Sequence, residues 1–225
     1  MMDRRGMLGG LAGTMLARTA EAASPGVPVE QFGPSGGGRA PIVLLHGSDG
    51  LTYAGRYEAA ARALVAAGYT VYIPHYFEAT GDRRANYREI GGKFGPWRQA
   101  IGTAIDGLVG DPAQGGTLAV VGFSLGGALA LASSTQDRRI KAVVNFFGFF
   151  PEELARANRV APTLTLHGDV DRTVPVENAR RIDRRVRELG APSEIEIYAS
   201  EGHGLSPRSL LDAGMRANAF LGRYL

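Results

Sequence analysis

Ser124, Asp171 and His203 are the side chains in this sequence whose types and order fit nucleophilic catalysis. Ser124 is the centre of a Gly-x-Ser-x-Gly pattern at residues 122–126, which follows an apolar run and precedes an apolar segment with helical spacing. Glycines on both sides of a serine permit a strained turn that lifts the hydroxyl out of a sheet. Because a serine hydroxyl is a poor nucleophile at neutral pH, it needs a base, which an acid must orient. The pattern therefore predicts a serine nucleophile with partners elsewhere in the chain.

The candidate base and acid both lie downstream of the serine, each just after a strand-like run. Of the two histidines that follow Ser124, His203 stands between two glycines that let a loop present its ring. His167 ends an apolar run, and we expect it to make local hydrogen bonds. Asp169 and Asp171 compete for the acid position. We favour Asp171, which lies deeper in its loop, and expect Asp169 to cap or brace the turn.

Two backbone N–H groups are needed to hold the charge that develops on a carbonyl oxygen under attack. Leu125 directly follows the nucleophile and supplies one N–H at the start of a predicted helix. The glycine-rich segment 46–50 follows an earlier apolar run and supplies the other, with Ser48 as the expected donor. His46 is then expected to brace this loop. An ordinary strand-to-helix turn is the alternative interpretation of segment 46–50.

The elements that must position these residues alternate regularly along the chain. Strand-length apolar runs span 27–32, 42–45, 70–73, 118–122, 142–147, 163–166 and 194–198. Segments with helical spacing span 53–67, 97–109, 125–134, 176–189 and 206–224. Because a parallel connection needs a crossover of helix length, the alternation predicts an α/β fold with a doubly wound, mostly parallel sheet and helices on both faces. Residues after the carboxyl ends of such strands can converge at one edge.

Two connections bear on access to that edge. Residues 148–162 have room for one short helix, so we expect no large lid domain there. Residues 75–96 form the longest irregular stretch, and they follow a strand at the edge where open α/β sheets bind ligands. The residues expected to contact substrate are His75, Tyr76, Arg83 and Phe149.

Composition excludes several kinds of chemistry. The 225 residues include no cysteine, which rules out a disulfide scaffold, a thiolate nucleophile and a cysteine-ligated metal. A net charge of +3, without a basic run interleaved with aromatics, gives no indication of nucleic-acid binding. Arg83, Arg84 and Arg88 could recognise a carboxylate or form a solvated loop, and both interpretations stay open. The sequence predicts no metal and no cofactor.

Residues 1–22 have the features of an export signal. Arg4 and Arg5 precede a mildly apolar segment at 9–17 and small residues at 20–23, an order that indicates the twin-arginine route. The apolar segment is too short to span a bilayer. We therefore expect an exported protein, periplasmic or secreted, with one domain at 23–225 and no stable membrane insertion. A disordered tail with a chance arginine pair is the alternative.

Five motifs occur in one order between about residue 27 and the C-terminus. They are His46-Gly47-Ser48-Asp49-Gly50, Ile73-Pro74-His75-Tyr76-Phe77, Gly122-Phe123-Ser124-Leu125-Gly126-Gly127, His167-Gly168-Asp169-Val170-Asp171 and Gly202-His203-Gly204-Leu205. In this order the chain resembles the dienelactone hydrolase family of the α/β-hydrolase superfamily. The resemblance implies an α/β-hydrolase fold, a nearly lidless hydrolase of esters or lactones, and a triad of Ser124, Asp171 and His203.

The chain departs from that family at two positions. The family's name-giving enzymes carry a cysteine where this chain has Ser124, and a glutamate where it has Gly47. This serine-nucleophile variant is therefore expected to be an esterase rather than an enzyme for dienelactone itself.

The leading hypothesis is a serine hydrolase that acts on a small carboxylic ester or lactone, with no nucleic-acid partner. Two other classes stay open. One is a non-catalytic binding protein that keeps the fold, because fold alone does not imply function. The other is a metal-dependent hydrolase that would use His167, Asp169, Asp171 and His203, although no paired-histidine motif on a helix supports it. The sequence indicates no particular oligomeric state.

Overall fold

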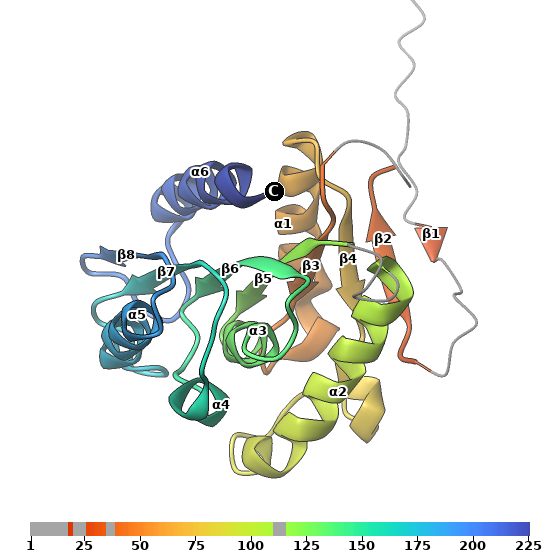
Figure 1. Ribbon diagram of the computed structural model, residues 1–225, viewed down its shortest axis with the longest axis horizontal. Helices are drawn as coiled ribbons and strands as arrows, with labels where there is room; N and C mark the ends of the chain where they lie inside the picture. Colours follow the sequence, from red (N-terminus) through yellow and green to blue (C-terminus); the bar gives the residue numbers. More distant parts are fainter. Residues whose placement is uncertain (1–17, 20–25, 35–38, 110–115) are drawn as a thin grey trace, which may run out of the picture.

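A central sheet of eight strands organises the part of the chain that the computed structural model describes, residues 18–19, 26–34, 39–109 and 116–225 (Figure 1). The strands are β1 (Arg18–Thr19), β2 (Val29–Phe32), β3 (Ile42–Leu45), β4 (Val71–Pro74), β5 (Leu118–Phe123), β6 (Ile140–Phe146), β7 (Thr163–Gly168) and β8 (Ser193–Tyr198). Their order across the sheet is β1-β2-β4-β3-β5-β6-β7-β8. From β4 to β8 all neighbours pair in parallel, whereas β1 and β2 add an antiparallel edge. The predicted mostly parallel sheet is confirmed.

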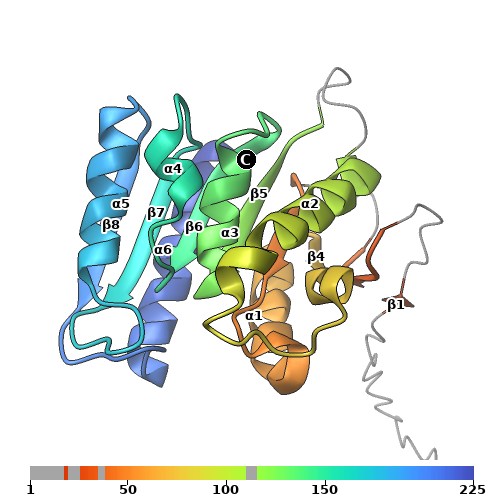
Figure 2. The ribbon, with the colours of Figure 1, turned by 90° about the horizontal axis from the view of Figure 1, so that it is seen from below.

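Helices cover both faces of this sheet, as the two ribbon views show (Figures 1 and 2). The α-helices are α1 (Ala54–Ala66), α2 (Ile90–Val109), α3 (Leu125–Ser134), α4 (Glu152–Arg156), α5 (Glu177–Glu188) and α6 (Pro207–Tyr224), and two 3₁₀ helices are η1 (Gly50–Tyr53) and η2 (Tyr76–Thr80). Buried residues of α2, α3, α4 and α5 form one apolar core, and those of α1 and α6 form the other. The doubly wound arrangement is therefore confirmed, and α4 is the one short helix between β6 and β7.

Alternation along the strands divides side chains between the two cores. Ile42 and Leu44 of β3 belong to the core with α1 and α6, whereas Val43 and Leu45 belong to the core with α2 and α3. All four are fully buried. Successive side chains of a strand point to opposite faces, so a parallel strand covered on both sides reads as a continuous apolar run. Burying each such side chain stabilises the fold by roughly 1.5–3 kcal/mol, which makes the sheet a rigid support for the loops at its edge.

Most predicted elements end close to where the structure ends them, but the region before residue 97 differs. We predicted residues 75–96 to be irregular, whereas η2 occupies part of this stretch and α2 begins at Ile90 with Pro96 inside it. The first part of α2 contains three glycines and Pro96, which are poor helix formers, so the local sequence does not predict a helix there. Tertiary packing overrides propensity here: Trp97 is fully buried, and its Nε1 donates a hydrogen bond of 2.6 Å to Thr80 Oγ1 in η2.

The predicted export signal at residues 1–22 lies outside the described residues, apart from the two residues of β1. Among the helices in the described part of the chain, none is both long and apolar enough to cross a membrane.

Candidate active site

Ser124 occupies a strained turn between β5 and α3. Its backbone angles are φ 53° and ψ −116°, a positive φ that non-glycine residues rarely adopt. The neighbouring chain passes so close that side chains at the flanking glycines are excluded. A Cβ at Gly122 would lie 2.2 Å from the carbonyl oxygen of Gly126, and a Cβ at Gly126 would lie 2.3 Å from that of Leu45. Glycine is therefore required on both sides of Ser124, because the surrounding backbone leaves no space for a side chain.

The structure brings the three predicted catalytic side chains together at the carboxyl edge of the sheet. His203 Nε2 lies 3.0 Å from Ser124 Oγ, and His203 Nδ1 lies 2.7 Å from Asp171 Oδ2. The side chain of Asp171 is fully buried and that of His203 is mostly buried. Asp169, the competing acid, is exposed and lies outside this chain of contacts. The arrangement can pass a proton from the serine hydroxyl to an imidazole that a carboxylate orients.

Local hydrogen bonds fix the carboxylate of Asp171. Its Oδ1 accepts the backbone N–H groups of Thr173 and Val174, each at 2.8 Å. His167 is fully buried behind it, with Nε2 2.8 Å from the carbonyl oxygen of Val174 and 3.4 Å from Asp171 Oδ2. Burial lowers the pKa of His167, so the ring is neutral at pH 7, and its Nε2–H donates a hydrogen bond to the carbonyl oxygen of Val174. His167 thus makes the local hydrogen bond that the sequence predicted.

The loop that carries His203 is tied to the acid loop and to α6. The carbonyl oxygen of Glu201 accepts the N–H of Val170 at 3.0 Å. The Glu201 carboxylate accepts hydrogen bonds from the N–H of Ser206, at 2.8 Å, and from the hydroxyls of Ser206 and Ser209 at the start of α6. Phe147 packs edge-on against the His203 ring at 5.0 Å between centroids. The Glu201 hydrogen bonds hold the loop, and Phe147 packs against one face of the space that the ring occupies.

Residues 46–50, which we call the oxyanion loop, lie beside the turn that carries Ser124. A Cβ placed on Gly47 would be 3.5 Å from the carbonyl oxygen of Phe123. Gly126, at the start of α3, approaches the carbonyl oxygens of Leu45 and His46 closely enough to exclude any side chain. The loop after β3 and the turn after β5 therefore form one packed unit, as two halves of an oxyanion hole require.

The N–H groups of Ser48 and Leu125 are the two predicted oxyanion donors. Among the described residues, the N–H of Ser48 meets no acceptor, and the N–H of Leu125 belongs to the first turn of α3, where helical N–H groups lack intrahelical partners. Neighbouring groups are engaged: the Tyr76 hydroxyl donates to the carbonyl oxygen of His46 at 2.7 Å, and the N–H of Ala85 donates to that of Ser48 at 2.7 Å.

His46 braces this loop from inside. Its Nδ1 lies 2.9 Å from the carbonyl oxygen of Gly47, and its ring stacks on that of Tyr76 at 4.1 Å between centroids. Burial lowers the pKa of His46 to about 4, so the ring is neutral at pH 7 and Nδ1 donates to Gly47. A neutral ring without a serine partner fits the bracing role that the sequence predicted.

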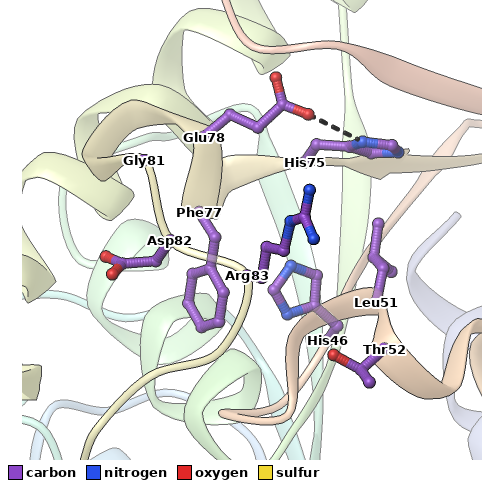
Figure 3. Close-up of a pocket in the computed structure, with 9 residues that line it drawn as sticks. All are labelled: His46, Leu51, Thr52, His75, Phe77, Glu78, Gly81, Asp82 and Arg83. Atoms are coloured by element: carbon purple, nitrogen blue, oxygen red, sulfur yellow. Dashed lines mark hydrogen bonds and ion pairs between the residues drawn. The ribbon is translucent and has the colours of Figure 1, made fainter.

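A cavity of about 570 Å³ adjoins the oxyanion loop (Figure 3). Its lining includes His46 from the loop, Leu51 from η1, and His75, Phe77 and Arg83 from the region of η2. Figure 3 shows the Arg83 side chain extending between the rings of His46 and His75. The cavity combines an apolar wall with a cationic group, a combination typical of small-molecule pockets, and its lining does not include Ser124, Asp171 or His203.

The four residues predicted to contact substrate are separated by the structure. His75 and Arg83 line the cavity. Tyr76 is fully buried and donates its hydroxyl to the loop backbone, so it presents no surface to a ligand and instead supports the oxyanion loop. Phe149 is half-buried and packs near Phe94 of α2, 6.1 Å between ring centroids, rather than in this cavity.

Of the basic side chains that line the cavity, His75 has acidic partners and Arg83 has none among the described residues. His75 is held between Glu30 of β2, at 2.7 Å, and Glu78 of η2, at 3.4 Å. Arg83 is exposed, and no ion pair in the described part of the chain involves it. Its guanidinium is therefore the available cation at the cavity.

The described residues contain no group of three histidine, aspartate or glutamate side chains placed to hold a metal ion. The four residues of the metal hypothesis serve other contacts: His167 donates to a carbonyl, Asp169 is exposed, and Asp171 and His203 bind each other. Sequence reasoning assigned no role to Asp49, although it stands in the motif at 46–50, and it missed Tyr57, which lies in helix α1 outside every motif.

The sheet order, the strained strand–Ser–helix turn, and the acid and histidine loops after β7 and β8 define an α/β-hydrolase fold. Within that class, residues 31–217 match the model of the dienelactone hydrolase family, and the chain belongs to this family.

Individual relatives are more distant. A Yersinia pestis protein named as a carboxymethylenebutenolidase is 28% identical over 100 residues, covering 40% of this chain and 37% of that protein. A protein of Oryza sativa subsp. japonica named as an inactive carboxylesterase is 32% identical over 93 residues, covering 38% of each chain. The chain thus spans well under half the length of both. The crystal structure of a dienelactone hydrolase from Anabaena variabilis matches with a TM-score of 0.71 at 21% identity, covering 93% of this chain and 97% of that one.

Proposed function

We propose that the protein hydrolyses a small carboxylic ester or lactone through an acyl-enzyme on Ser124. The observation that carries the proposal is the continuous chain of contacts from Ser124 Oγ through His203 to Asp171, at 3.0 and 2.7 Å. Membership of the dienelactone hydrolase family supports an ester or lactone as the substrate class.

The proposed reaction runs in two steps. In the first, Ser124 Oγ attacks the carbonyl carbon while His203 Nε2 takes its proton, and the carbonyl oxygen gains a negative charge. The N–H groups of Ser48 and Leu125 hold that charge. As the tetrahedral intermediate collapses, His203 returns the proton to the leaving oxygen, and an acyl ester remains on Ser124. In the second step, water attacks the acyl ester by the same route. Asp171 orients His203 and stabilises its imidazolium form.

The cavity beside the oxyanion loop supports a small substrate. About 570 Å³ accommodates a group of a few rings or a short chain, and we propose that His75 and Arg83 contact it. An exposed guanidinium without an ion pair suits a substrate that carries a carboxylate.

Replacing the nucleophile tests the proposal. Ser124→Ala is expected to abolish turnover of short-chain aryl esters and labelling by a serine-directed fluorophosphonate, while circular dichroism and melting temperature stay close to wild type. Unchanged ester turnover in the purified variant would contradict the proposal.

A non-catalytic binding protein is the second candidate, and the relative named as an inactive carboxylesterase favours keeping it. The same probe separates the two. A binding protein would leave Ser124 unlabelled by the fluorophosphonate in the folded wild-type chain, and no ester or lactone in a panel would be turned over.

We also propose that residues 1–22 direct export and that residues 23–225 are the mature domain. Adjacent arginines in the charged segment support the twin-arginine route. A fusion of residues 1–22 to a reporter should reach the periplasm, and the double change of Arg4→Lys and Arg5→Lys should retain it in the cytoplasm. Equal export of both fusions would overturn the twin-arginine assignment.

A further inference from the structure

Around the N–H of Ser48, the carbonyl oxygens of His46, Gly47 and Ser48 all accept hydrogen bonds. The carbonyl oxygen of Gly47 accepts both the N–H of Gly50, at 3.0 Å, and His46 Nδ1, at 2.9 Å. Tyr76 and Ala85 bind the carbonyl oxygens of the residues on either side. A donor fixed in this way needs no reorganisation as charge develops on the substrate, which is the condition for a large electrostatic contribution to catalysis.

The N–H of Gly47 is bound by Tyr57 of α1. Tyr57 Oη accepts this N–H at 2.9 Å and donates its own proton to Asp49 Oδ1 at 2.6 Å. The Tyr57 ring is 2% exposed, and it packs edge-on against Phe123 at 5.7 Å between centroids. Since Phe123 precedes the nucleophile, Tyr57 touches both halves of the predicted oxyanion hole.

Asp49 sets the direction of this hydroxyl. Because a carboxylate only accepts hydrogen bonds, the Tyr57 proton points toward Asp49 and an oxygen lone pair faces Gly47. Burial, followed by the hydrogen bond to Asp49, raises the pKa of Tyr57 above its ordinary value, so the proton stays on the hydroxyl. Arg56 lies 3.4 Å from Asp49 Oδ2 and partly balances the carboxylate charge.

We infer that Tyr57, oriented by Asp49, is a positioning residue that holds the oxyanion loop and thereby aims the N–H of Ser48 at the developing charge. The inference deepens the proposed function and rests on it. Neither residue touches the reacting atoms, so both act through the loop backbone. We therefore expect them to stabilise the transition state, in which the oxyanion forms, and to contribute little to substrate binding.

Tyr57→Phe is the direct test, with rates referred to the active-site concentration obtained by fluorophosphonate titration. We expect kcat per titrated site to fall about 10-fold, with KM changed less than twofold, because a loosened donor stabilises the transition state less. The affinity for an arylboronic acid, which forms a tetrahedral anion on serine, should fall by a similar factor. A purely structural role would lower the titrated fraction and leave both quantities unchanged.

Tyr69→Phe is the matched control. Tyr69 is equally buried and lies just before β4, away from the carboxyl edge of the sheet. Its hydroxyl accepts a hydrogen bond of 2.7 Å from Arg39. We expect this variant to keep wild-type kcat per site, even where it melts at a lower temperature.

Asp49 provides a second route if Tyr57→Phe fails to fold. Asp49→Ala should lower kcat about as much as Tyr57→Phe, whereas Asp49→Asn, which keeps an acceptor oxygen, should recover most of the rate. Wild-type kcat per site in both Tyr57→Phe and Asp49→Ala would overturn the inference. If Ser124→Ala also kept its activity, the proposed function itself would fail, so the two failures are distinguishable.

Discussion

On the acid–base side of the site, Asp171 takes hydrogen bonds from residues two and three positions further along the chain. On the oxyanion side, the loop at 46–50 is held by Tyr57 of α1, Tyr76 of η2 and Ala85 of the following loop. The acid's carboxylate is therefore fixed mainly within its own motif, whereas the oxyanion loop is assembled from separate elements. A short motif can specify a turn and its caps, but contacts between elements exist only when the sheet has formed.

Breaking the acid–base side should have the largest effect. Asp171→Asn keeps the size of the side chain but presents an amide that cannot orient the imidazole as the carboxylate does. We expect kcat for an aryl ester to fall on the order of 10³–10⁴-fold, with the fold retained. The matched change Asp169→Asn, at the exposed neighbouring acid, should stay within twofold of wild type. Equal losses in the two variants would mean that the acid is misassigned.

The contact between the oxyanion loop and the start of α3, after the nucleophile, is the next target. A Cβ at Gly126 would lie 2.3 Å from the carbonyl oxygen of Leu45 and 2.5 Å from that of His46, so α3 and the oxyanion loop would have to separate. Gly126→Ala is expected to destabilise the protein by about 3 kcal/mol, as measured by urea unfolding.

Gly102→Ala serves as the control for that change. Gly102 lies in α2, where an added Cβ meets no atom within 4 Å. The same substitution there should stabilise the protein by about 0.5–1 kcal/mol, because alanine favours the helix. If Gly126→Ala were as well tolerated as Gly102→Ala, the oxyanion loop and the start of α3 would not be packed as one unit.

Acid should weaken the oxyanion side through His46. Its pKa is about 4 in the folded protein, against an ordinary value of 6.5, so the unfolded chain binds a proton between these values and the folded chain does not. The free energy of unfolding is therefore unaffected by this group above about pH 6.5 and decreases as the pH falls toward 4. The decrease is about 2 kcal/mol at pH 4.5.

His46→Asn tests this linkage, since its amide can still donate to the carbonyl oxygen of Gly47. The difference in unfolding free energy between pH 7 and pH 4.5 should be about 2 kcal/mol smaller in this variant than in wild type, as measured by urea unfolding at both pH values. Parallel pH profiles for the two proteins would show that His46 is not the titrating group.

The predictability of the fold follows the same division. The runs at 42–45 and 118–122 were predicted as strands because buried parallel strands read as continuous apolar runs. The prediction that this helix starts at residue 97 was wrong, because α2 begins at Ile90. Gly92, Gly95 and Pro96 disfavour a helix locally, but burial of Trp97 stabilises one. The prediction that Tyr76 contacts substrate was also wrong, because its side chain is fully buried. Its place after a strand does not indicate which way the ring points.

By itself, the sequence determined the doubly wound sheet, the strained turn at Ser124 and the loops that carry Asp171 and His203. These depend on hydrophobic periodicity, glycine and capping chemistry, all of which act between residues close in the chain. Only the tertiary structure decided that Tyr57 binds both the N–H of Gly47 and Asp49, and that Arg83 and His75 line the same cavity. Those contacts join segments that no local rule relates, because they arise from the packing of α1 and η2 against the end of β3.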